Sequence, residues 1–132
     1  PIGDAVRSIL DGHIVLSREL ATQNHYPAID VLESVSRLAR DLTTPKQQEL
    51  TGRGRESMAI HRRNQDLINI GAYPMGSNPA IDEAIHLHEP LKAFLRQPID
   101  RGFTTDESWE QLTRTVATPR PGTRAAIPEV RP

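Results

Sequence analysis

One short apolar stretch, HIVLS at residues 13–17, most constrains the fold of this chain. Its β-branched and apolar residues favour a buried strand, and helical patterns flank it at residues 3–10 and 17–24, the second with Ser17 as N-cap. Helix, strand, helix at this spacing is typical of half of an α/β layer. One strand cannot form a sheet by itself, because its backbone N–H and C=O groups need partners. We therefore expect the partner strands upstream of Pro1, in a longer chain from which this one has been cut.

The stretch HYPAIDVLESVSR, residues 25–37, follows the second helical pattern. It begins with a His-Tyr-Pro-Ala turn and ends with an arginine after Ser-Val-Ser. We interpret it as a loop. Within it, Asp30 is expected to bond to the backbone of a turn rather than to act as a catalyst.

Residues 46–71 are largely helical in composition, and Pro45 suits the first position of a helix. Gly52 and Gly54 each cost about 1 kcal/mol relative to alanine inside a helix, so we expect a break or fraying near them. Gly71 suits the C-terminal end of that helix. The pattern further predicts a loop at 73–79, short helices at 80–89 and 90–97 separated at Pro90, and a helix at 105–116.

The last of these helices is amphipathic. Thr105 or Asp106 is expected to cap it, and Trp109, Leu112 and Val116 are expected to face inward. Residues 117–132 contain four prolines and three arginines, a composition typical of a disordered tail. The predicted fold is α/β at residues 1–42, then a small all-α domain at 43–116, and then the tail.

Composition excludes several classes of protein. The formal net charge of -1 gives no electrostatic case for binding nucleic acid or an anionic membrane. The absence of cysteine excludes disulfides and thiolate metal sites, and fits a reducing cytosol. The longest apolar run, residues 14–16, is far too short to span a bilayer.

The histidines do not predict a metal site. His86 and His88 are two residues apart on a predicted helix and so point in different directions, which favours surface positions. His13, His25 and His61 have no evident ligand partners in the sequence. The basic runs RGRES and HRR are interpreted as a solvated helix face, with binding of a partner in a ring assembly as the alternative.

Two sets of motifs carry a resemblance to a known family. ILDGHIVLSRELA followed by HYPAIDVLESVSR closely resembles the export ATPases of flagella and type III secretion systems, which are similar to the catalytic subunits of rotary ATP synthases. DLINIGAY, GSNPAIDEAI and LKAFLRQ resemble the helical C-terminal domain of the flagellar export ATPase. The resemblance covers residues 1–97. It implies that the first 42 residues are the end of a RecA-like P-loop NTPase domain.

The resemblance implies ATP and Mg²⁺ as ligands, at the junction between neighbouring subunits of a hexameric ring. In the family, a Gly-rich loop with a lysine and a serine or threonine holds the phosphates. No G-x-x-x-x-G-K-[ST] motif occurs in these 132 residues, and TGRGRES lacks both the spacing and the lysine. The catalytic glutamate also belongs to the part that is missing upstream. We therefore expect the nucleotide and Mg²⁺ to be bound mainly by that part, and this chain alone to be inactive.

The resemblance also implies roles for single residues. Arg37 matches the arginine that projects into the nucleotide site of the neighbouring subunit, whereas the nearby Arg40 falls outside the motif. Tyr26 matches the aromatic residue that stacks on adenine, with Pro27 stiffening its backbone. Ile70 and Ala72 belong to the segment that closes over the base in relatives, although helix packing is an alternative role for them.

As a whole, the resemblance implies a cytoplasmic hexameric ATPase that energises protein export at the inner-membrane face of the export apparatus. Stalk and regulator proteins and chaperone–substrate complexes are the implied partners, and membrane association is expected only through the export machinery. Two alternatives stay open: a helical interaction module without catalysis, and a fragment of a rotary synthase subunit. DLINIGAY and GSNP favour the export group, with a preference for the flagellar system over the injectisome.

Overall fold

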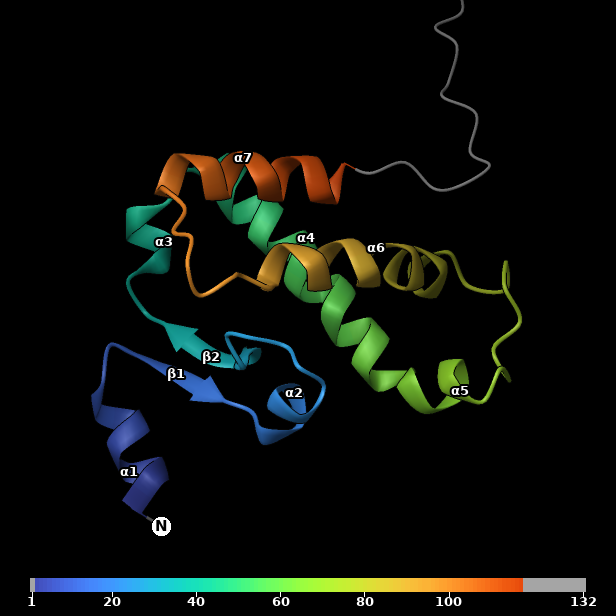
Figure 1. Cartoon of the computed structure of the whole chain (residues 1–132), viewed down its shortest axis with the longest axis horizontal. Helices are drawn as coiled ribbons and strands as arrows, with labels where there is room; N and C mark the ends of the chain where they lie inside the picture. The colour runs from blue at the N-terminus through green and yellow to red at the C-terminus, as the bar shows by residue number, and fades with distance from the viewer. Residues whose placement is uncertain (1, 118–132) are drawn as a thin grey trace, which may run out of the picture.

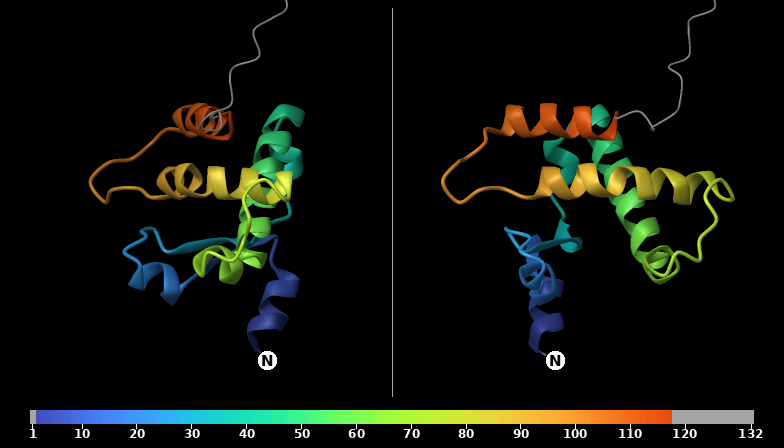
Figure 2. Two further views of the ribbon diagram at one scale, coloured as in Figure 1. Left: turned by 90° about the vertical axis from the view of Figure 1, so that its right-hand side faces the viewer. Right: turned by 45° about the vertical axis from the view of Figure 1, so that its right-hand side comes forward.

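A computed structural model describes residues 2–117 of the chain. A two-stranded ribbon lies below a layer of helices, and the first helix projects away from both (Figures 1 and 2). The expected order of an α/β segment followed by an all-α segment is confirmed. The elements are α1 (Ile2–Ile9), β1 (Gly12–Leu16), α2 (Arg18–Thr22), β2 (Ile29–Ser36), α3 (Ala39–Leu42), α4 (Pro45–Arg63), α5 (Gln65–Asn69), α6 (Pro79–Leu95) and α7 (Thr105–Val116).

The strand β1 has its partner inside the segment that we interpreted as a loop. β2 pairs with β1 in antiparallel register, with Gly12 opposite Ser36 and Leu16 opposite Ile29. The loop interpretation was therefore wrong for residues 29–36, and so was the expectation that β1 could be paired only by strands upstream. Aliphatic residues of IDVLESV favour the extended backbone. The ladder is irregular between His13 and Val15, and Ser34 Oγ accepts the Val15 N–H there at 3.0 Å.

The short helix α2 begins where the sequence predicts. Ser17 is the N-cap, and its hydroxyl accepts the Leu20 N–H at 3.3 Å. This bond satisfies one of the backbone donors that are free at the start of a helix. After the helix the chain turns at Asn24, whose φ of 57° is left-handed, and then leads to β2.

The long helix α4 runs without interruption through both glycines, so the expected break near Gly52 and Gly54 is absent. Thr44 and Gln47 form a capping box at its start, and Pro45 occupies the first turn as predicted. Gly54 is buried where α4 crosses α6. A Cβ placed on it would lie 3.8 Å from Leu91 Cδ2, so Leu91 of α6 packs directly against this position. Packing along this crossing outweighs the low helix propensity of glycine.

The helical pattern at residues 46–71 forms two helices that meet at Asn64, which ends α4 and begins α5. Gly71 follows α5 with a φ of 71°, a left-handed value that glycine adopts without strain. Its expected place just past the helical segment is confirmed.

The helix α6 continues through Pro90, so the predicted pair of short helices is one helix of 17 residues. A proline removes one backbone hydrogen bond from a helix interior. Buried residues on both sides of it, Leu87 and Leu91, hold the two halves against the same core. Asn78 caps the start, with its side chain accepting the N–H groups of Ala80 and Ile81.

The last helix, α7, is capped one residue earlier than predicted. Thr104, rather than Thr105 or Asp106, is the N-cap, because its hydroxyl and the Glu107 side chain form a reciprocal capping box. Leu112 and Val116 are buried, which confirms their predicted inward position.

The core of the described chain lies in its helical half. Leu87, Leu91, Leu112 and Val116 form a buried cluster, and four further side chains pack against it: Leu50, Met58, Phe94 and Trp109. In contrast, large apolar side chains of α1 and β1 such as Ile9 and Ile14 are more than two-thirds exposed. The predicted tail at 117–132 lies outside the described residues, apart from Ala117. Among residues 2–117, no helix combines the length and apolar character that a membrane crossing needs.

Candidate functional site

The strand β2 carries the two residues that the sequence singles out, one at each end. Tyr26 lies in the bend before the strand and is half exposed, and Arg37 lies in the turn after it with an exposed side chain. An eight-residue strand spans on the order of 25 Å at about 3.3 Å per residue. The strand therefore keeps the two residues well apart.

The loop that bears Tyr26 is held from the helical half of the chain. Arg96, directly after α6, donates through Nη2 to the carbonyls of Gln23 at 3.2 Å and Asn24 at 3.1 Å. The next residue, Gln97, donates its N–H to the Tyr26 carbonyl at 2.9 Å. The end of α6 therefore fixes the backbone on which the Tyr26 ring stands.

The turn that bears Arg37 is held from the other side. The Arg37 N–H donates to the carbonyl of Asp11 at 2.6 Å, which ties this turn to the connection between α1 and β1. Arg40 lies one turn further along, within α3. A guanidinium that extends from such a turn can stabilise negative charge on a phosphate of a neighbouring molecule.

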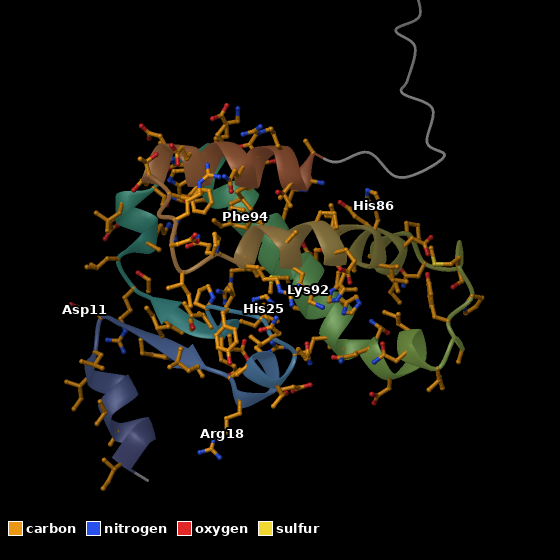
Figure 3. The ribbon with its side chains drawn as sticks, viewed as in Figure 1. Asp11, Arg18, His25, His86, Lys92 and Phe94 are labelled. Atoms are coloured by element: carbon orange, nitrogen blue, oxygen red, sulfur yellow. The ribbon has the colours of Figure 1, made fainter. Side chains whose placement is uncertain are left out.

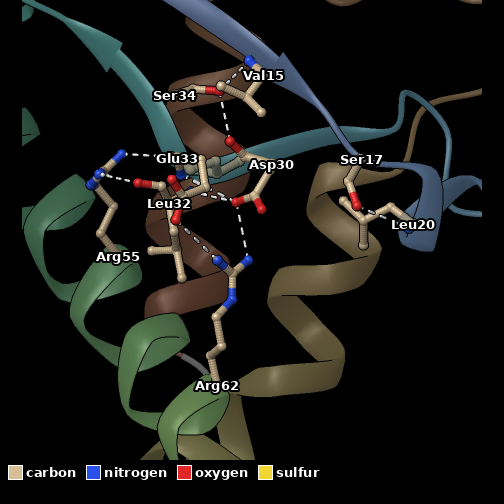
Figure 4. Close-up of polar contacts among 10 residues, drawn as sticks. Val15, Ser17, Leu20, Asp30, Leu32, Glu33, Ser34, Arg55 and Arg62 are labelled. Atoms are coloured by element: carbon tan, nitrogen blue, oxygen red, sulfur yellow. Dashed lines mark hydrogen bonds and ion pairs between the residues drawn. The ribbon is translucent and has the colours of Figure 1, made fainter. Parts of the chain in front are cut away.

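A polar network joins β2 to α4 and is centred on Asp30 (Figure 4). Asp30 Oδ1 accepts the N–H groups of Leu32 at 3.1 Å and Glu33 at 3.2 Å, and forms an ion pair with Arg62 at 3.0 Å. Asp30 bonds to the backbone as predicted, although in a strand rather than in a turn. Burial alone would raise the pKa of this carboxyl, but the bonds from Arg62 and from the backbone outweigh burial and lower it.

The basic runs on α4 do more than face solvent. Arg55 donates to the carbonyls of Val31 at 2.7 Å and Leu32 at 3.3 Å, and Arg53 forms an ion pair with Glu83 of α6 at 2.9 Å. Sequence reasoning missed these contacts. The one available signal was the seven-residue spacing of Arg55 and Arg62, which places both on one face of a helix.

A polar cavity of about 390 Å³ lies between the α2 connection, α4 and α6. His25 and Lys92 lie in this region in Figure 3, whereas His86 lies on the other side of α6. His25 is buried, and its Nδ1 has no hydrogen-bond partner among the described residues. Burial, helped by the positive charges of Arg96 and Lys92, lowers the pKa of His25.

Two further histidines of this cavity stack on each other. The rings of His61 and His88 are parallel within 2°, with centroids 3.7 Å apart. His88 is thus engaged with α4 rather than being a simple surface residue. In residues 2–117 no group of three or more side chains of the metal-binding types is arranged to hold an ion.

The segment after α5 is more exposed than the Tyr26 loop. Ile70 is three-quarters exposed and Ala72 is also exposed, and both lie in the turn that closes α5. Neither lines the polar cavity. None of the hydrogen bonds described for residues 2–117 joins either residue to Tyr26. Their contact with a nucleotide base therefore stays a prediction.

Two family profiles match the chain. The T3SS EscN ATPase C-terminal domain matches residues 43–114, which is more than half of the chain. The ATP synthase alpha/beta family nucleotide-binding domain matches residues 1–36. The second match ends just before Arg37 and includes Tyr26.

Curated relatives agree with these profiles. The chain is 44% identical over 113 residues to the flagellum-specific ATP synthase of Bacillus subtilis, covering 86% of this chain and 26% of the relative. It is 43% identical over 112 residues to the type 3 secretion system ATPase of Pseudomonas syringae pv. syringae, covering 85% and 25%. The chain therefore spans about a quarter of the length of these relatives.

Solved structures show the same similarity. The assembled ATPase EscN from the type III secretion system of enteropathogenic E. coli matches with a TM-score of 0.83 and 40% identity, over 89% of this chain and 28% of that one. EscN in complex with its central stalk EscO matches with a TM-score of 0.82 at the same identity, over 89% and 29%.

Proposed function

The chain belongs to the T3SS EscN ATPase C-terminal domain family, and from this premise we propose that it is the C-terminal part of a hexameric ATPase that energises flagellar or type III protein export. The observation that carries the proposal is the placement of Tyr26 and Arg37 at opposite ends of β2. In a ring, such a strand can present its tyrosine to the nucleotide of its own subunit and its arginine to that of the neighbour. Similarity to flagellar and type III secretion ATPases supports ATP hydrolysis as the activity of the whole protein.

Within this proposal Arg37 acts in trans. Its guanidinium would stabilise charge that develops on the γ-phosphate oxygens during hydrolysis. An arginine supplied in this way is worth about 10³- to 10⁵-fold in rate. Tyr26 would hold the adenine by stacking, with Ile70 and Ala72 as candidates for a weak apolar contact with the base.

The phosphates and Mg²⁺ would be held by residues outside this chain. The 132 residues contain no phosphate-binding loop, and the described residues offer no cluster of metal ligands. We therefore propose that residues 1–42 complete an ATPase domain, that residues 43–116 form the helical domain, and that the chain by itself does not hydrolyse ATP.

The proposed partners follow from the relatives. EscN has been solved with its central stalk EscO, which supports a stalk protein as a partner of the assembled ring. Regulator proteins and chaperone–substrate complexes are further proposed partners, and nucleic acid is not. The proposed location is the cytoplasm at the inner-membrane face of the export apparatus.

The test is ATP turnover by the complete protein carrying Arg37→Ala. We expect kcat to fall about 10³-fold or more while ATP binding stays within about twofold, because the arginine would act on the transition state. Arg40→Ala, three residues further along the chain, is the matched control and should keep most of the activity. Undiminished turnover in Arg37→Ala would overturn the assignment.

The second candidate is a helical interaction module without catalysis. It is favoured by the self-contained core of α4, α6 and α7, which leaves the apolar side chains of α1 and β1 exposed. Reading the gene upstream of the codon for Pro1 separates the two candidates. A phosphate-binding loop in that reading frame supports the ATPase, and a start codon directly upstream supports the module.

A further inference from the structure

One face of α4 carries a polar stripe that runs along β2 and the turn after it. Gln48, Arg55 and Arg62 are each seven residues apart, close to two turns of 3.6 residues, so they share one face. All three side chains reach the segment 30–43. The contacts are Gln48 Nε2 to the carbonyls of Arg40 at 2.9 Å and Thr43 at 3.1 Å, Arg55 to the carbonyls of Val31 and Leu32, and Arg62 to Asp30 Oδ1.

The three contacts follow the chain in reverse order. Arg62, late in α4, contacts the start of β2, and Arg55 contacts its middle, as Figure 4 shows. Gln48, early in α4, contacts the segment beyond the strand. The helix is therefore fastened to residues 30–43 at three successive points, two on β2 and one beyond it.

Arg37 lies between two of these points. It follows Leu32 by five residues and precedes Arg40 by three. The short span from 32 to 40 is therefore fixed at both ends, by Arg55 and by Gln48. The Arg37 N–H is bonded as well, to Asp11 on the opposite side. A short span with both ends fixed has few conformations, so the direction of the Arg37 side chain depends on where α4 holds β2.

We propose that Arg55 is a positioning residue for Arg37: by bonding two consecutive carbonyls of β2, it sets the place from which the trans arginine extends. This inference rests on the proposed function, because it concerns the activity of Arg37. It makes the helical domain a participant in hydrolysis, since a shift of α4 relative to β2 would move Arg37.

The chemistry of Arg55 suits this role. Its planar guanidinium presents donors in a rigid fork, so a single side chain can fix two carbonyls at once. A lysine retains the charge but offers a single nitrogen that cannot reproduce the fork. A small misplacement of a group that must meet a transition state costs about 10- to 100-fold in rate, while nucleotide binding depends on other residues.

The experiment is a double-mutant cycle on ATP turnover by the complete protein. Arg55→Gln should lower kcat about tenfold and leave the KM for ATP within about twofold. In the Arg37→Ala background the same substitution should change kcat by less than about twofold, because the group through which Arg55 acts is already gone. Arg55→Lys should restore part of the lost activity.

The matched control is Arg53→Gln, two residues away on α4, whose ion pair with Glu83 stays within the helical domain. It should change kcat by less than about twofold. A thermal unfolding midpoint for each variant separates positioning from loss of fold, and if Arg55→Gln does not fold, Arg55→Lys takes its place in the cycle.

The outcomes separate the two levels of the proposal. A tenfold loss from Arg55→Gln in both backgrounds overturns the positioning role and leaves the trans arginine intact. No loss from Arg55→Gln overturns it as well. An active Arg37→Ala protein overturns the proposed trans arginine itself, and the positioning role with it.

Discussion

His61 of α4 and His88 of α6 stack face to face, with ring centroids 3.7 Å apart and planes within 2° of each other. The pair joins the two longest helices at the wall of the polar cavity. Burial lowers the pKa of both imidazoles. The charge of its partner lowers the pKa of His61 further, and Glu89 opposes the shift of each.

Acidification should therefore destabilise the fold. The pKa values of His25, His61 and His88 all lie below 6.5 in the folded state, so the unfolded state binds more protons as the pH falls. Above about pH 6.5 the three histidines are neutral in both states and do not reduce the free energy of unfolding. That free energy falls as the pH drops from there through the folded pKa values. Urea unfolding of the chain at pH 7.5, 6.5 and 5.5 measures the effect.

A double variant tests the part of the stacked pair in this prediction. His61→Gln combined with His88→Gln should reduce the loss of stability on acidification. Equal pH dependence in the double variant and the parent would contradict a role for the stacked pair.

The arrangement of β2 shows how far the sequence alone can lead. The aliphatic residues of β2 suit a strand, but the His-Tyr-Pro-Ala sequence before it and Asp30 within it are typical of turns, which favoured a loop in a local interpretation. In the structure Asp30 satisfies backbone donors at an irregular part of the ladder, which a local pattern cannot distinguish from a turn.

In the helices too, features set by neighbouring residues were predictable, whereas features set by packing were not. The N-cap Ser17 and the first-turn proline Pro45 were predictable because both depend on neighbours in sequence. Continuity through Gly54 and Pro90 depends on packing between α4 and α6, which local propensity does not contain. The contacts of Arg55 join residues more than 20 positions apart, so only the fold reveals them.

Removing the Asp30 carboxylate should loosen β2. Asp30→Ala leaves two backbone N–H groups and Arg62 without their acceptor, at a cost of about 1–2 kcal/mol in unfolding free energy once the partial exposure of Arg62 is considered. Asp30→Asn retains one acceptor and should cost about half as much. Urea unfolding at pH 7.5 measures both, and equal stability of the Ala variant and the parent would contradict the network.

Glycine substitutions should have opposite effects in the helix and the strand. Gly52→Ala meets nothing within 4 Å and should stabilise α4 by about 1 kcal/mol through helix propensity. Gly12→Ala would place its Cβ 2.9 Å from the Val35 carbonyl oxygen, so it should destabilise the ribbon by about 1–3 kcal/mol. Thermal unfolding of the two variants side by side is the measurement. A lower midpoint for Gly52→Ala would be the contrary result.

The bonds from Arg96 to the loop that bears Tyr26 should affect nucleotide affinity rather than turnover. Arg96→Gln removes the bonds to the carbonyls of Gln23 and Asn24, which frees the backbone that carries the Tyr26 ring. If the proposed function holds, the KM of the complete protein for ATP should rise about three- to tenfold, with kcat within about twofold, because stacking on the base would contribute equally to the ground and transition states.

Two comparisons make that result specific. Tyr26→Ala should raise the KM at least as much, and Arg96→Gln should then add little, because the ring that the loop positions is absent. Arg114→Gln, which removes an exposed ion pair with Glu110 on α7, should leave both constants unchanged. A fall in kcat at constant KM in Arg96→Gln would be the contrary result. It would indicate that the end of α6 acts on the end of β2 near Arg37, because a weaker contact with the base alone cannot slow the chemical step of bound ATP.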